Sequence, residues 1–201
     1  MPRPKQRTPE LRERLVQAAL TTLAGEGVSG FTTRRVAQSA GTSPPAVYEF
    51  FGDRAGLVRE VFFEGFKRLG TRLRSVVETK EPRIDLVSVL HEFRLFARES
   101  PELAMLMFSR PFVDFDPDPS DRQAGAMVRE LLVARVKRCM DSGLFTGQPT
   151  DVAHVCLAVV QGLALQETTG WLGTSKASID RRWNLALNAV LDGLERRGLG
   201  Q

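Results

Sequence analysis

The stretch that most constrains the fold is TSPPAVYEFF at residues 42–51, where two prolines follow a serine directly. Proline lacks an N–H group and fixes φ near the helical value, so it fits the first positions of a helix, where an N–H group has no partner inside the helix. Ser43 is a favourable N-cap residue, and the apolar residues that follow recur at helical spacing. The segment therefore predicts a helix that starts abruptly at Pro44.

A second short helix precedes this one. Thr32 can cap it, Val36 and Ala37 supply its apolar side, and Gly41 follows it in the position that favours left-handed geometry. Two short helices joined by a tight turn that contains glycine are typical of a helix-turn-helix. In that motif the second helix enters the major groove of DNA. Tyr48, the only tyrosine of the chain, lies one turn into this second helix.

Helical periodicity dominates the rest of the chain. A first helix is capped by Thr8 and ends near Gly25 and Gly27, and a long helix of about 25 residues begins after Asp53. Five further helical segments follow, separated at 110–121 by a loop rich in proline and aspartate. Because no alternating strand pattern of useful length is present, we predict an all-α fold of about nine helices. We expect a helix-turn-helix domain at residues 1–53 and a larger helical domain at 54–201.

Composition and charge narrow the class of protein. Hydrophobic residues make up 42% and charged residues 26%, as in ordinary globular proteins. No apolar run is long enough to span a membrane, and the N-terminus lacks the apolar centre of a signal peptide, so we expect a cytoplasmic protein. The net charge is +4, and residues 1–60 carry nine Lys/Arg against six Asp/Glu. A basic N-terminal segment suits DNA, although a solvated surface would explain a surplus of three almost as well.

The sequence offers little for catalysis or for metal binding. Cys139 and Cys156 lack CxxC spacing and lie within apolar helical patterns, which favours buried reduced thiols over a disulfide or a metal site. Neither of the two histidines, His91 and His154, belongs to an HExxH motif or to a comparable cluster of catalytic or metal-binding residues. We therefore expect no enzyme activity, no metal and no cofactor.

The run FTTRRVAQSAGTSPPAVYEFFGDRAGLV closely resembles the TetR family of bacterial transcriptional regulators. The resemblance covers roughly residues 8–60. It rests on the threonine-capped helix, the AG-x-S turn, Tyr48 to Phe51 as Tyr-x-x-Phe, and Arg54 three positions after that phenylalanine. It implies a three-helix DNA-binding head on a helical body that binds a small molecule and dimerises through its last two helices.

The resemblance also implies individual contacts to DNA. The residues expected to bind phosphates carry hydroxyl, phenol or guanidinium groups: Thr32, Thr33, Arg34, Ser43, Tyr48 and Arg54. Those expected to face bases are Pro44, Pro45, Ala46 and Glu49. The family commonly has lysine, glycine and threonine at the first three of these positions, so few base hydrogen bonds are available here. The prolines and the alanine can touch thymine methyls, and Glu49 can accept from a cytosine amine.

Two further sets of residues are candidates in the helical body. For the small-molecule pocket they are large apolar or polar side chains at helical spacing, each of which core packing would explain as well: Phe62, Phe66, His91, Met105, Phe108, Phe112, Gln166 and Trp171. For a homodimer interface they are small residues and an apolar stripe, which packing within one chain would also produce: Ala158, Gly162, Trp183, Leu187, Val190 and Leu194. A two-fold symmetric dimer matches two-fold related DNA half-sites.

The leading hypothesis is therefore a ligand-responsive transcriptional repressor that binds a palindromic DNA operator as a homodimer. Its effector is an unknown small molecule, and the operator sequence and the sign of regulation are open. An alternative is a helical ligand-binding or scaffold protein with a vestigial DNA-binding head, which the departures from the family pattern at Pro44, Pro45 and Glu49 leave open. An all-α enzyme is the third hypothesis, and it lacks a recognisable set of catalytic residues.

Overall fold

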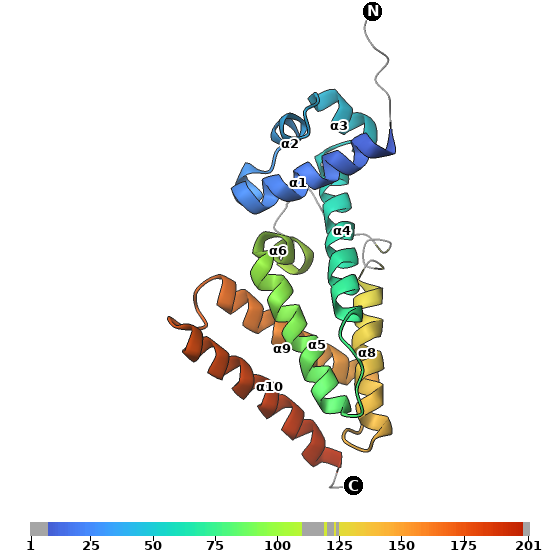
Figure 1. The fold of residues 1–201 in the computed structure, drawn as a ribbon, viewed down its shortest axis with the longest axis vertical. Coiled ribbons are helices and arrows are strands. Elements are labelled where there is room, and N and C mark those ends of the chain that lie inside the picture. The colour runs from blue at the N-terminus through green and yellow to red at the C-terminus, as the bar shows by residue number, and fades with distance from the viewer. Residues whose placement is uncertain (1–7, 110–118, 120–122, 124, 199–201) are drawn as a thin grey trace, which may run out of the picture. The chain divides into compact units, whose positions relative to one another are not determined.

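The computed structural model describes residues 8–109, 119, 123 and 125–198 of the chain (Figure 1). Within these residues it contains nine α-helices and no strand, which confirms the predicted all-α class. The helices are α1 (Pro9–Gly30), α2 (Thr33–Ser39), α3 (Pro44–Phe51), α4 (Arg54–Arg74), α5 (Pro82–Glu99), α6 (Pro101–Ser109), α8 (Ala126–Asp141), α9 (Pro149–Thr168) and α10 (Lys176–Gly198). Apart from Pro119, the loop expected at 110–121 lies outside the described residues.

The first helix begins as predicted and ends later than predicted. The Thr8 hydroxyl accepts a hydrogen bond from the Leu11 amide at 3.3 Å, which is the expected N-cap. Gly25 lies inside the helix, and the break comes at Gly27, whose φ of 66° and ψ of −171° are not helical. A left-handed φ favours glycine because it has no Cβ, and the chain then completes one more turn before Gly30.

Internal contacts divide the chain into two compact units, and the division differs from the one expected at residue 53. One unit contains residues 1–65 and 102–122, and the other contains 66–101 and 123–201. Helix α4 contributes residues to both, because its buried side chains continue along its whole length. It ends at Arg74, about one turn earlier than the apolar pattern suggested, and Val77 beyond it is 77% exposed.

The first unit is built on α1, α2 and α3, which pack in sequence, with the first part of α4 and α6 (Figure 1). Helix α6 approaches α4 closely at Gly65, where an added Cβ would lie 2.6 Å from the Met107 sulfur. The core of this unit consists of apolar side chains that are at most 1% exposed: Leu15, Ala19, Leu23, Phe31, Val36, Ala37, Val47, Leu57, Val58, Val61 and Leu106.

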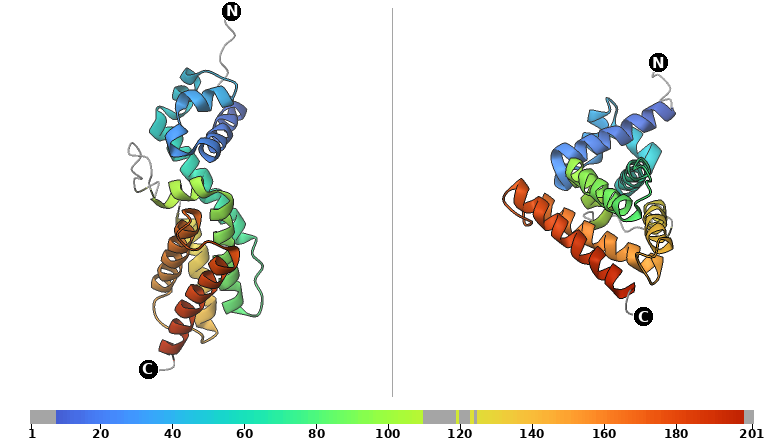
Figure 2. Two further views of the ribbon diagram at one scale, coloured as in Figure 1. Left: turned by 90° about the vertical axis from the view of Figure 1, so that its left-hand side faces the viewer. Right: turned by 60° about the horizontal axis from the view of Figure 1, so that its bottom comes forward.

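The second unit is a helical bundle (Figure 2). Helix α9 packs against α5, α8 and α10, and α5 also packs against α8. A buried ion network joins three of these helices: Arg94 on α5 donates to Glu167 on α9 at 2.7 Å and to Asp180 on α10 at 2.8 Å. Arg94 and Glu167 are 9% and 10% exposed, and a pair so buried requires good geometry to offset its loss of hydration.

Candidate nucleic-acid interface

The turn between α2 and α3 has the local structure of a helix-turn-helix. The Thr32 hydroxyl caps α2 by accepting from the Arg35 amide at 3.3 Å, as predicted. Gly41 adopts a φ of 68° in the turn, and Ser43 has the extended backbone of an N-cap residue. Pro44 and Pro45 then occupy the first two positions of α3, as the sequence indicated.

Ser43 differs from the prediction, because its hydroxyl makes no capping hydrogen bond. An N-cap side chain accepts from the amide of the second or third helical residue. The second residue is Pro45, which has no N–H, and the amide of the third, Ala46, donates to the Ser43 carbonyl at 2.9 Å. The hydroxyl is therefore not used as a cap at the start of α3.

Helix α3 has one buried side and one exposed side. Ala46 and Val47 are 3% and 0% exposed and face the core. The prediction that Ala46 faces DNA bases was therefore wrong, because its methyl group packs inside the unit. Pro45, Tyr48 and Glu49 are exposed, and their spacing of three and four residues places them on one face of the helix.

Tyr48 is tied to the neighbouring helix. Its hydroxyl lies 3.2 Å from the Thr33 hydroxyl on α2, within hydrogen-bonding distance, while 49% of the residue is exposed. The contact fixes the direction of the phenol and leaves it accessible. Two predicted phosphate ligands, one on each helix of the motif, are thus brought together.

The arginines of this region have different surroundings. Arg34 is exposed on α2, whereas Arg35 forms an ion pair with Glu26 on α1. Arg54, at the start of α4, donates through Nε to the Phe31 carbonyl at 3.3 Å. Arg54 therefore holds the connection between α1 and α2, a structural role that its spacing in the sequence did not indicate.

Comparison with known families decides what this arrangement is. Residues 15–61 match the model of the bacterial regulatory proteins of the tetR family, and residues 86–190 match the model of the tetracyclin repressor-like C-terminal domain. The chain belongs to the TetR family. It is a DNA-binding transcriptional regulator.

Solved structures agree with this fold over nearly the whole chain. A protein of unknown function from Rhodococcus sp. RHA1 is 26% identical with a TM-score of 0.78, covering 96% of this chain and 100% of that one. A TetR transcription regulator from Haloarcula marismortui ATCC 43049 is 22% identical with a TM-score of 0.72, at 93% and 99% coverage. The regulator FadR from Bacillus subtilis, solved with stearoyl-CoA, is 13% identical with a TM-score of 0.72, at 90% and 98% coverage. A comparison with curated proteins finds no match.

The residues predicted for the small-molecule site of this TetR-family protein are divided between the two compact units. Phe62, Met105 and Phe108 lie in the first unit, and Phe112 lies outside the described residues. Phe66, His91, Gln166 and Trp171 lie in the second. Burial lowers the pKa of His91, and the nearby Arg94 guanidinium lowers it further.

Two members of this set are poor candidates for an enclosed pocket. Trp171 is 85% exposed in the turn after α9. The backbone carbonyl of Gln166 accepts hydrogen bonds from the amides of Trp171 and Leu172, and the Gln166 side chain is exposed.

No helix among the described residues is long and apolar enough to cross a membrane. The described residues also contain no group of three or more acidic, histidine or cysteine side chains placed to hold a metal.

The residues predicted for the dimer interface also separate into two groups. Ala158 and Gly162 are exposed on α9, and Val190 and Leu194 are partly exposed on α10. Trp183 and Leu187 are 0% and 3% exposed, so they pack within the chain and cannot meet a partner. For these two residues the prediction was wrong, because the apolar stripe of α10 faces the bundle.

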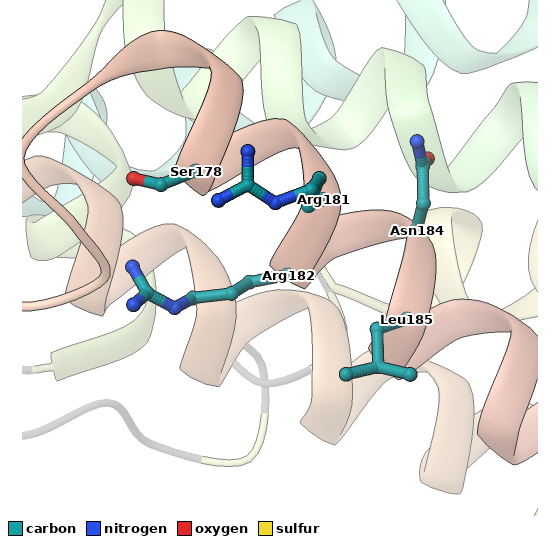
Figure 3. Close-up of a pocket in the computed structure, with 5 residues that line it drawn as sticks. All are labelled: Ser178, Arg181, Arg182, Asn184 and Leu185. Carbon is teal, nitrogen blue, oxygen red and sulfur yellow. The ribbon is translucent and has the colours of Figure 1, made fainter.

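Other residues supply the exposed apolar surface of these helices. Val155 and Leu165 on α9 are each 46% exposed, and Leu185 on α10 is 70% exposed. Beside Leu185, α10 lines a hollow of about 450 Å³ with the side chains drawn in Figure 3: Ser178, Arg181, Arg182, Asn184 and Leu185. Leu185 lies two residues from each of the buried Trp183 and Leu187, a spacing that places it on the opposite side of α10.

Proposed function

We propose that this TetR-family protein is a ligand-responsive repressor that binds a palindromic DNA operator as a homodimer in the cytoplasm. The observation that carries the proposal is the Thr33–Tyr48 pair, which holds an exposed phenol on the outer face of α3. A fixed hydroxyl at this place can donate to a phosphate without first losing side-chain freedom. The protein would act by binding, and its effector would control that binding.

The contacts with phosphates are assigned to the hydroxyls of Thr33, Ser43 and Tyr48 and to the Arg34 guanidinium. Each is at least partly exposed, and Ser43 makes no cap. Thr32 and Arg54 remain in the set with a second role, since Thr32 caps α2 and Arg54 holds the Phe31 carbonyl. Base contacts are assigned to Pro45 and Glu49, which are exposed. Pro44 is only partly exposed and is assigned a peripheral contact.

The homodimer is assigned to the outward faces of α9 and α10. On α9, Val155, Ala158, Gly162 and Leu165 are all exposed, and their spacing places them along one side of the helix. The small residues Ala158 and Gly162 allow a partner helix to approach closely. Pairing through a two-fold axis would present two copies of α3 to two related half-sites.

The effector is assigned to the helical body, with Phe66 and His91 as the first residues to test in the second unit. An effector can regulate only if it binds the DNA-competent and the DNA-incompetent conformations with different affinity. Helix α4 is continuous between the head and the body, so a change in the body has a direct covalent route to the head.

The test is selection of DNA from a random duplex library by the purified protein, followed by affinity measurements on the enriched sequence. We expect a palindrome whose affinity falls steeply as salt rises, because bound phosphates release counterions. Tyr48→Phe should weaken binding about tenfold, the loss of one charge-assisted hydrogen bond. Phe63→Tyr, a substitution of the same size on α4, should leave the affinity unchanged.

If the selection enriched no DNA sequence, the repressor hypothesis would be rejected. The alternative, a ligand-binding protein with a vestigial DNA-binding head, would then be favoured. Unchanged affinity of Tyr48→Phe on an enriched palindrome would reject the assignment of α3, while leaving DNA binding itself intact. Repression rather than activation would be read from a reporter gene placed behind the enriched palindrome.

A further inference from the structure

The outer face of α3 contains an acidic side chain where a DNA-binding surface would be expected to be basic or neutral. Among the eight residues of α3, Glu49 is the sole one with a charged side chain. It is exposed, on the same face as Pro45 and Tyr48. The Glu49 carboxylate forms no hydrogen bond and no ion pair with the residues that the structure describes, so none of their cations neutralises it.

A bare carboxylate near a phosphate backbone raises the free energy of every complex with DNA, whatever its sequence. That cost is offset only where the carboxylate meets a hydrogen-bond donor. The phosphates and sugars of B-DNA offer it none, and the donors in the major groove are the amino groups of cytosine and adenine. The cost is therefore recovered on some sequences and not on others, which is the condition for sequence selectivity.

Cytosine suits the carboxylate better than adenine does. The edge of adenine places the N7 acceptor beside its N6 amino group, so one carboxylate oxygen would face a lone pair. Cytosine presents its N4 amino group beside a C–H edge, and guanine and thymine present acceptors at the corresponding positions. The other two side chains on this face do not compete for the base, because Pro45 has no polar group and the Tyr48 hydroxyl, held beside Thr33, is assigned to a phosphate.

We propose that Glu49 determines operator specificity by accepting a hydrogen bond from the N4 amino group of a cytosine in each half-site. This rests on the proposed function, in which α3 lies in the major groove. Pro45, one turn earlier on the same face, would contact the neighbouring pair through apolar atoms alone. The operator would then contain a C·G pair at one fixed position of each half-site.

The experiment compares the full-length wild-type protein with Glu49→Gln and with Glu13→Gln. Glu13 is exposed on α1, so its substitution removes the same charge away from α3. Each protein selects from a random duplex library, and dissociation constants are then measured on the enriched duplex and on one whose key C·G pairs are T·A. Circular dichroism confirms that the three proteins are folded alike.

The wild type should enrich cytosine at one position per half-site and lose about tenfold or more in affinity on the T·A duplex. Glu49→Gln should lose that preference and favour adenine, whose N6 and N7 pair with an amide. Glu13→Gln should keep the wild-type preference, with at most a uniform change in affinity.

Two outcomes would overturn the proposal, and they are distinguishable from failure of the proposed function. If the wild type and Glu49→Gln enrich the same palindrome, Glu49 does not read a base, although the protein still binds an operator. If Glu49→Gln gains affinity equally on both duplexes without a change in preference, the carboxylate is merely repulsive. If the wild type enriches no sequence, the protein does not bind a specific operator, and both this proposal and the proposed function fail.

Discussion

The indole Nε1 of Trp183 on α10 donates a hydrogen bond to a carboxylate oxygen of Glu167 on α9, at 2.6 Å. The Arg94 guanidinium binds the same carboxylate and lies 4.9 Å from the centre of the indole ring. Trp183 is 0% exposed, so its N–H group requires a partner within the protein. This contact sets which side of α10 faces the bundle and therefore which side faces outward.

Trp183→Phe should lower the free energy of unfolding by about 2–4 kcal/mol, because it removes a hydrogen bond to a charged group and leaves a small cavity. Urea denaturation followed by circular dichroism measures the change. Trp171→Phe is the matched control, and its effect should stay within about 0.5 kcal/mol since Trp171 is 85% exposed. Equal midpoints for the two variants would show that the buried hydrogen bond does not stabilise the fold.

Leu165→Glu and Leu185→Glu should convert the protein to a monomer, because each places a charge on the outward face proposed for the dimer. Sedimentation velocity measures the mass. Val77→Glu is the control, at an apolar residue beyond the end of α4 that is 77% exposed, and it should leave the mass unchanged. A dimer that survives both substitutions on α9 and α10 would place the interface elsewhere.

Asp85 should make the protein sensitive to acid. The carboxylate is 2% exposed, and although burial acts to raise its pKa, hydrogen bonds from Thr79 and Arg138 hold the pKa at about 2 against an ordinary value of 3.8. Because the folded pKa is the lower one, this stabilisation is present above pH 3.8 and is lost as the pH falls towards about 2.

The variant Asp85→Asn tests this. It should lower the free energy of unfolding by about 1–3 kcal/mol at pH 7, and its difference from the wild type should shrink as the pH falls below 4. Guanidinium titrations between pH 2.5 and 7 measure both effects. Asp141→Asn, at an exposed carboxylate, is the control, and a pH-independent difference for Asp85→Asn would contradict the prediction.

Cys139 and Cys156 should not react with thiol reagents in the native protein. Both are free and buried, as the sequence indicated, and burial raises the pKa of each thiol to about 11. A high pKa leaves almost no thiolate, which is the reactive form. Ellman's reagent should label both thiols only after denaturation, whereas Thr146→Cys, at an exposed position, should add one rapidly reacting thiol. Rapid native labelling of the wild type would contradict the burial.

The sequence alone determined the features that depend on a few neighbouring residues. The all-α class follows from helical periodicity, and the starts of α1, α2 and α3 follow from Thr8, Thr32 and the prolines after Ser43. Each of these signals acts over one or two turns of helix, where a cap or a proline meets its own backbone. The helix-turn-helix could be recognised for the same reason.

The tertiary structure decided which side of each helix is buried. Ala46, Trp183 and Leu187 face the core, while Glu49, Leu165 and Leu185 face outward, and helical spacing alone does not distinguish these sides. The partner that orients α10 is far away in sequence, since Arg94 lies 86 residues before Asp180. One side of a helix is buried only when another helix packs against it. Which helix does so depends on contacts between segments that are far apart in the sequence, and a local sequence pattern does not specify those contacts.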